Sequence, residues 1–242
     1  MSIKGDHFLQ RVREAVAEGN RTAGAPALDP RGAVGYQGAG ADPVIRFRDE
    51  FIAAGGFVHV VADPVATSEI VVLLLRERSV HRVLLGAGGV LDSLDLYAQL
   101  KIAGLEITHT SDDGERRDDY FAAEAGISGV DYLIAETGSL VLLSRPEQPR
   151  SLSLLPPIHI AVARLDQILP DLFDLFEPGL WADRGGLPSC LSIITGPSKT
   201  GDIELRLVTG VHGPGEVHVV LIAPSSPLGT GFCGAVLARA SG

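Results

Sequence analysis

Between residues 57 and 110, short apolar runs rich in β-branched residues alternate with longer stretches that have helical spacing. The apolar runs are FVHVVA, RVLLGA and LEITHT, at residues 57–62, 82–87 and 105–110. Two stretches with helical spacing separate them, at residues 66–78 and 91–103. Each crossover between parallel strands lays a helix over the sheet, so nearly continuous apolar strands indicate burial on both faces. This pattern predicts an α/β fold with a Rossmann-like, mostly parallel sheet and helices on both faces.

Further strands are predicted in the second half of the chain. DYLIAETGSLVLLS, at residues 131–144, is interpreted as two strands joined by a tight turn. LSIIT (191–195) and VHVVLIA (217–223) are interpreted as later strands, the second being the last core strand. His159 and His218 alternate with apolar residues inside predicted strands, which is typical of structural histidines.

The N-terminal part differs in composition from the rest. Apolar residues between Asp6 and Glu18 recur at helical spacing, and residues 19–43 are rich in Gly, Pro and Ala with few large apolar residues. We therefore expect a leading helix and an exposed connection over residues 1–43. One α/β domain over residues 44–242 should follow, because 45% of the 242 residues are hydrophobic and can form a sizeable core.

Charge and cysteine content narrow the classes of partner and cofactor. The formal net charge is -10 with no basic cluster, which disfavours nucleic acid. The longest apolar runs fall far short of the roughly 20 residues of a membrane span, and the N-terminus has no signal-peptide pattern, so we expect a cytoplasmic protein. Cys190 and Cys233 have no ligand-type spacing, and no histidine pair does either, so no metal site is predicted in this chain.

The segment AETGS places a carboxylate, Glu136, between an apolar strand and a glycine turn formed with Thr137 and Gly138. Ligands of open α/β sheets bind beyond the carboxyl ends of the strands, so Glu136 is a candidate nucleophile or general base. A structural alternative carries equal weight. In that alternative, Glu136 accepts N–H bonds from the turn and pairs with an arginine such as Arg145 or Arg150.

The segment GPSKTGDIE follows a predicted strand and is a candidate anion site. Ser198 is placed as the N-cap of a helix that begins near Lys199, and the hydroxyl of Thr200 adds a further donor. The spacing is not that of a nucleotide-binding P-loop. The alternative, which composition favours, is an ordinary capped helix in which Asp202 and Glu204 balance the helix dipole.

The segment TGVHGPGEVHVVLI places His212 on a glycine-flanked turn next to Gly213, before the last strand. A loop position allows the ring to face a site, and its pKa lies near neutrality. The alternative is that the ring only caps the turn. In RVLLGAGGVLD, the order of strand, glycine loop and helix is a weak nucleotide signal without GxGxxG spacing.

At DYLIAETGSLVLLS, LSLLPPIHIAV and ITGPSKTGDIELRLVTGVHGPGEVHVVLI, the chain closely resembles the lactate utilization protein C family, whose members consist of a LUD domain. The resemblance covers most of residues 131–222 and extends more loosely from Phe57. It implies a role in oxidising L-lactate to pyruvate for growth on lactate, beside two partner proteins that carry iron-sulfur clusters. No cofactor is then expected in this chain.

The resemblance also implies a fold similar to the group of ribose-5-phosphate isomerase, glucosamine-6-phosphate deaminase and coenzyme A transferases. In coenzyme A transferases, the glutamate of a Glu-x-Gly motif attacks the acyl thioester, and Glu136-Thr137-Gly138 has that form. A likeness at the level of the fold does not establish an activity.

The resemblance, together with the position of these segments at strand ends, implies one cleft for a small carboxylate or phosphate. In it, Lys199 holds the anion while Glu136 and His212 manage a proton. The predicted ligand-binding residues are Thr137, Gly138, Ser198, Lys199, Thr200, Asp202 and Gly213. Two functions follow from different classes: a non-redox component of a lactate-oxidising assembly, or a stand-alone enzyme of the coenzyme A transferase or sugar-phosphate isomerase type that uses Glu136.

Overall fold

The chain divides into two compact units, and the larger one carries the sheets. The computed structural model describes residues 3–19, 36–110, 117–177, 180, 188, 190–200 and 208–223. The first unit, Met1–Tyr36, contains helix α1 (Ile3–Gly19), which covers the segment where helical spacing predicts a helix. The second unit, Gln37–Gly242, contains all the other helices and strands.

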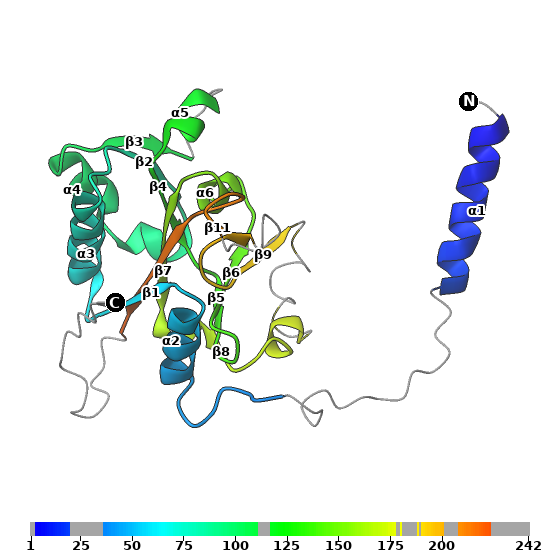
Figure 1. Ribbon diagram of the computed structural model, residues 1–242, viewed down its shortest axis with the longest axis horizontal. Helices are drawn as coiled ribbons and strands as arrows, with labels where there is room; N and C mark the ends of the chain where they lie inside the picture. The colour runs from blue at the N-terminus through cyan, green and yellow to red at the C-terminus, as the bar shows by residue number, and fades with distance from the viewer. Residues whose placement is uncertain are drawn as a thin grey trace. The chain divides into compact units, whose positions relative to one another are not determined.

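A six-stranded sheet that is parallel throughout forms the centre of the second unit (Figure 1). Its order is β1-β12-β7-β4-β2-β3, so the first and last of its strands along the chain are neighbours at one edge. The strands are β1 (Phe57–Val61), β12 (Glu216–Ile222), β7 (Ile158–Arg164), β4 (Ala125–Gly129), β2 (Arg82–Leu85) and β3 (Glu106–His109). The prediction of a parallel α/β sheet is confirmed.

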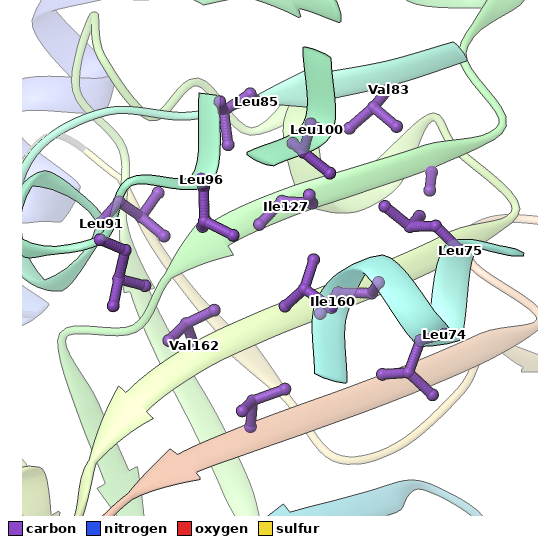
Figure 2. Packing of buried hydrophobic residues seen from close by; sticks show 14 of the residues in the cluster. Leu74, Leu75, Val83, Leu85, Leu91, Leu96, Leu100, Ile127, Ile160 and Val162 are labelled. Atoms are coloured by element: carbon purple, nitrogen blue, oxygen red, sulfur yellow. The ribbon is translucent and has the colours of Figure 1, made fainter. Parts of the chain in front are cut away.

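Helices α3 (Pro64–Glu77) and α4 (Leu96–Ile102) cover one face of this sheet. Their leucines pack onto alternate residues of the strands, including Ile127 of β4 and Ile160 of β7 (Figure 2). The single helix predicted over 91–103 is divided into the 3₁₀ helix η2 (Gly89–Ser93) and α4.

The other face is covered by helix α2 (Pro43–Ala53) and a smaller mixed sheet, and towards β2 by α5 and α6 (Figure 1). Phe47 and Phe51 of α2 are fully buried there. The small sheet has the order β8-β5-β6-β9. The remaining bounds are β5 (Tyr132–Ile134), β6 (Ser139–Leu143), β8 (Ile168–Leu169), β9 (Leu191–Ile194), α5 (Arg117–Ala122), α6 (Ser151–Leu154), η3 (Leu165–Gln167) and η4 (Asp174–Phe176).

The prediction of a helix that begins near Lys199 is wrong. Lys199 and Thr200 instead form β10, which pairs in antiparallel fashion with β11 (Val208–Thr209). The N–H of Ser198 donates to the carbonyl of Pro214, and its own carbonyl accepts from Gly210, so these backbone groups bond to a distant segment rather than to a helix turn.

Candidate functional site

Glu136 lies at the turn between β5 and β6, which belong to the small sheet and not to the six-stranded one. It is half-buried, and its Oε1 accepts the backbone N–H groups of Gln37 (3.1 Å) and Gly38 (3.3 Å). The donors thus come from the segment before α2 rather than from the turn. Arg145 is engaged elsewhere, because its Nη2 lies 3.0 Å from Oδ1 of Asp131.

The other residues of this turn contact the end of β9 and helix α2. Oγ1 of Thr137 lies 2.7 Å from Oγ of Ser139, which lies 2.7 Å from Oγ1 of Thr195, so three hydroxyl groups join the turn to the end of β9. Gly138 has φ +60°, and a Cβ added there would lie 2.4 Å from the backbone nitrogen of Phe51. Glycine is therefore required by both the conformation and the close approach of α2.

Two of the predicted ligand-binding residues, Ser198 and Gly213, lie close together. A Cβ built on Gly213 would lie 3.4 Å from Cβ of Ser198. His212 is exposed on the adjoining turn, and no described residue bonds to its ring. This turn precedes β12, so it lies at the amino end of that strand, whereas ligands of open α/β sheets bind at the carboxyl ends. Asp202 lies outside the described residues.

Lys199 and Glu136 contact different segments around α2. Nζ of Lys199 donates to the carbonyl of Ala54 at 2.5 Å, just after the last residue of α2. A lysine at this position satisfies a helix-terminal carbonyl and interacts favourably with the helix dipole. Glu136, by contrast, bonds to the segment that precedes α2. Thr200 follows in β10, where it is half-buried.

A partly buried network of polar side chains at the edge of the six-stranded sheet was not predicted. Nδ1 of His218 lies 3.0 Å from Nε2 of His59, and Nε2 of His218 lies 2.5 Å from Oε1 of Glu216. Nε of Arg78 donates to the same carboxylate oxygen. A carboxylate only accepts hydrogen bonds, so Nε2 of His218 carries the proton and Nδ1 accepts from His59.

Burial sets the protonation of these groups. It lowers the pKa of His218 to about 4, against the opposing effect of Glu216. Burial, and then the charge of Arg78, also lower the pKa of His59. Partial burial acts to raise the pKa of Glu216, but hydrogen bonds from His218 and Arg78 hold it below its ordinary value. At neutral pH this group of side chains therefore contains two neutral imidazoles, those of His59 and His218, and one ion pair, between Arg78 and Glu216.

A second unpredicted constellation lies between the two sheets, beside the carboxyl end of β4. Oγ of Ser128 lies 2.8 Å from Nε2 of His159, and both residues are fully buried. Ser128 lines a small cavity together with Gln148, Arg150 and Ser153. Burial lowers the pKa of His159 to about 4, so this ring is neutral at physiological pH. The alternation of His159 with apolar residues was visible in the sequence, but its partner on β4 was not.

Two classes of feature are absent from the described part of the chain. No helix there is long and apolar enough to cross a membrane. No group of three or more His, Cys, Asp or Glu side chains there is placed to hold a metal ion.

Sequence comparisons point to one family. The sequence profile of the LUD domain matches residues 44–222. Lactate utilization protein C of Halalkalibacterium halodurans is 39% identical over 145 residues, which are 58% of this chain and 62% of that protein. Lactate utilization protein C of Bacillus subtilis is 38% identical over 104 residues, 42% of this chain and 43% of that protein. These matches span roughly half the length of the curated relatives.

A comparison of folds agrees with the sequence. The crystal structure of a DUF162 family protein from Deinococcus radiodurans at 1.70 Å resolution superposes with a TM-score of 0.54. It covers 74% of this chain and 96% of that chain at 22% identity, which supports a shared fold. Because the domain profile covers both sheets and the helices that flank them, the chain belongs to the LUD domain family.

Proposed function

We propose that this chain is a cytoplasmic lactate utilization protein that acts as a non-redox component of a system oxidising L-lactate to pyruvate. Two partner proteins carry the iron-sulfur clusters in this proposal. The observation that carries it is the LUD domain match over residues 44–222, together with the name lactate utilization protein C that the relatives bear. The role assigned to this chain is to bind ligand and partners.

The described side chains support a binding role. The small cavity beside β4 is lined by residues with polar side chains, among them Ser128, Gln148 and Ser153. In the predicted anion site, Ser198 bonds through its backbone N–H and carbonyl, and Lys199 donates from its side chain to a backbone carbonyl. No described residue bonds to the hydroxyl of Ser198. Neither arrangement needs this chain to transfer electrons.

One observation favours a second function, a stand-alone enzyme of the coenzyme A transferase or sugar-phosphate isomerase type. Glu136 uses only Oε1 in its bonds to Gln37 and Gly38, and no described residue bonds to Oε2. The second oxygen of this half-buried residue is therefore available to act as a nucleophile or base. The two functions make different predictions for the purified chain.

The deciding experiment is an anaerobic pull-down of the full chain from lactate-grown cells, with iron and sulfide analysis and an assay of lactate-dependent dye reduction. Cells grown without lactate and an unrelated bait provide the controls. We expect iron-sulfur proteins and lactate oxidation in the eluate, and neither from the chain alone. Recovery of an iron-free chain that turns over an acyl-CoA or a sugar phosphate by itself would replace this proposal with the second function.

A further inference from the structure

Strand β1 forms one edge of the six-stranded sheet, and none of the described strands pairs with its outer side. The carbonyl of Val61 accepts the N–H of Ala223, which follows β12, so the backbone groups of Val61 point inward, towards β12. Backbone groups of successive residues in a strand point to alternate sides. The N–H and carbonyl groups of Val58 and Val60 therefore point outward, to the free edge.

The two edge strands of this sheet differ in how they discourage further pairing. Strand β3, at the opposite edge, begins with Glu106, whose side chain is 76% exposed and pairs with Arg82. Exposed charges of this kind hinder the addition of another strand to an edge. Strand β1 has the sequence FVHVV, which contains neither proline nor an acidic residue, lysine or arginine. It therefore lacks the features with which natural proteins keep an edge strand unpaired.

Apolar side chains are exposed on both faces of β1. Phe57 points to the face that α3 covers, where its ring stacks on that of His218, yet 45% of its surface is exposed. Val60 points to the opposite face, as Val58 does, and it is 50% exposed. Apolar surface that gathers at one place on a protein marks an interaction site more often than scattered apolar residues do. The edge of β1 is therefore a candidate interface.

The two helices that contact β1 add apolar residues to this edge. On α2, Glu50 packs against Gly138 of the small sheet. Ile52 is two residues further along the helix, so it lies on nearly the opposite flank, away from the small sheet, and it is 49% exposed. On α3, Leu73 is 48% exposed and lies one turn before Glu77, whose charge acts on the histidine of β1. Both faces of the edge thus continue into apolar surface.

This edge has three layers, α2, β1 and α3, and the layers indicate the kind of partner that fits. A single extended peptide would pair with β1 but would leave Ile52 and Leu73, on the helices to either side, uncovered. A stable interface buries roughly 800 Å² on each partner, which is more than a strand of five residues offers. A second copy of this edge presents the same three layers and covers all of them.

We propose that two copies of this chain associate edge to edge, with their β1 strands antiparallel about a two-fold axis at His59. His59 is the middle residue of β1, so this register pairs the whole strand. Val58 then lies opposite Val60 of the second copy, and their outward N–H and carbonyl groups bond in both directions. Phe57 lies opposite Val61 of the second copy, an aromatic and β-branched pair that stabilises sheets. The paired strands bring no like charges together, although each chain has a formal net charge of -10.

The first test is sedimentation of the full chain over a range of micromolar concentrations. We expect a dimer whose dissociation constant rises by roughly tenfold or more in Val60→Lys, because the two new charges lie diagonally across the contact. Val211→Lys is the matched control, since Val211 is 46% exposed in the segment between β11 and β12, and it should dissociate like the wild type. V60K should fold normally, because Val60 is half exposed and its N–H is not used within the sheet.

A disulfide cross-link tests the register. Residues directly opposite each other in a non-hydrogen-bonded antiparallel pair have Cα atoms about 4.5 Å apart, which is within the range of a disulfide. In a chain that carries Cys190→Ser and Cys233→Ser, His59→Cys should therefore form a disulfide-linked dimer under mild oxidation. His212→Cys, at an exposed histidine far along the chain from β1, should not.

Three results would overturn the inference: a monomer at all concentrations, equal dissociation constants of the wild type and V60K, or no cross-link by H59C in a folded protein. Thermal melting of each variant verifies folding. A monomer in which the amides of Val58 and Val60 exchange slowly would assign this edge to another segment of the same chain, against the inference. The proposed function is tested separately, because association of the purified chain requires neither lactate nor iron-sulfur partners.

Discussion

Nε2 of His59 donates a hydrogen bond to Nδ1 of His218 across 3.0 Å, and the two rings are stacked with their centroids 5.2 Å apart. The contact joins neighbouring parallel strands, β1 and β12, which are separated by most of the chain. The His218 imidazole must stay neutral for this bond to persist, because protonation of its Nδ1 would place two donors face to face. This edge of the sheet is therefore sensitive to acid.

We predict that the free energy of unfolding falls as the pH is lowered from 6.5 to about 4. His159 and His218 have pKa values of about 4 in the folded protein, below the ordinary histidine value of 6.5, so in this window the unfolded chain binds protons that the folded chain does not. Each histidine accounts for on the order of 3 kcal/mol of this fall in the free energy of unfolding. Urea unfolding at several pH values measures this loss.

The variant His218→Gln should show a shallower loss of stability with pH, whereas His212→Gln should keep the wild-type slope, since His212 is exposed. A free energy of unfolding that stays constant between pH 6.5 and 4.5 would contradict the assignment of neutral buried imidazoles.

Glu216→Gln should destabilise the protein by about 1–3 kcal/mol, because Arg78 loses a charged partner that is only partly exposed. It should also lower the pKa of His218 further, since Glu216 is the group that raises it. Unfolding by urea measures the first effect, and titration of the histidine ring signals by NMR measures the second.

Glu106→Gln is the control for this prediction. Glu106 pairs with Arg82 on the surface, where ion pairs contribute about 0–1 kcal/mol. If both variants lose the same stability, the ion pair of Glu216 is no stronger than a surface pair.

Gly138→Ala should cost at least about 3 kcal/mol, because it adds the strain of a positive φ to a collision with the backbone of α2. Gly88→Ala provides the comparison. Gly88 also has a positive φ, of +87°, but nothing lies within 4 Å of its added Cβ, so only backbone strain of about 1–3 kcal/mol is expected. Equal losses in chemical denaturation would show that the turn is not held tightly against α2.

Glu136→Gln should leave stability within about 1 kcal/mol of the wild type, because the amide oxygen still accepts from Gln37 and Gly38. Glu136→Met removes the acceptor and should cost about 1–3 kcal/mol. Growth on lactate of a strain that lacks its own copy gives the functional measurement. Full restoration of growth by E136Q would exclude a catalytic role of this carboxylate.

The layers of the fold could be predicted because their signals are local. Apolar runs of strand length, separated by stretches with helical spacing, identify the parallel sheet without knowledge of long-range contacts. The turn between β5 and β6 was visible for the same reason, in the glycine that follows Glu136. Its membership of a second sheet was not visible, because that depends on pairing with β8 and β9.

The helix predicted at Ser198 was wrong because a serine before a polar stretch marks either a helix start or a turn into a strand. Pairing with residues 208–209 decides between them, and that contact is not encoded nearby. The bond between Ser128 and His159 was missed for a related reason. The register of β4 against β7 places these residues together, and neither has a local motif.

The close contact between Gly138 and the backbone of Phe51 affects how α2 can unfold. In the turn between β5 and β6, Glu136 accepts hydrogen bonds from the segment before α2. Gly138, two residues later, packs closely against the second half of the same helix. One short turn thus holds both the second half of α2 and the segment that leads into this helix. Slow amide hydrogen exchange in α2 should therefore persist or vanish together with that of β5 and β6, and the helix and the small sheet should open as one cooperative unit.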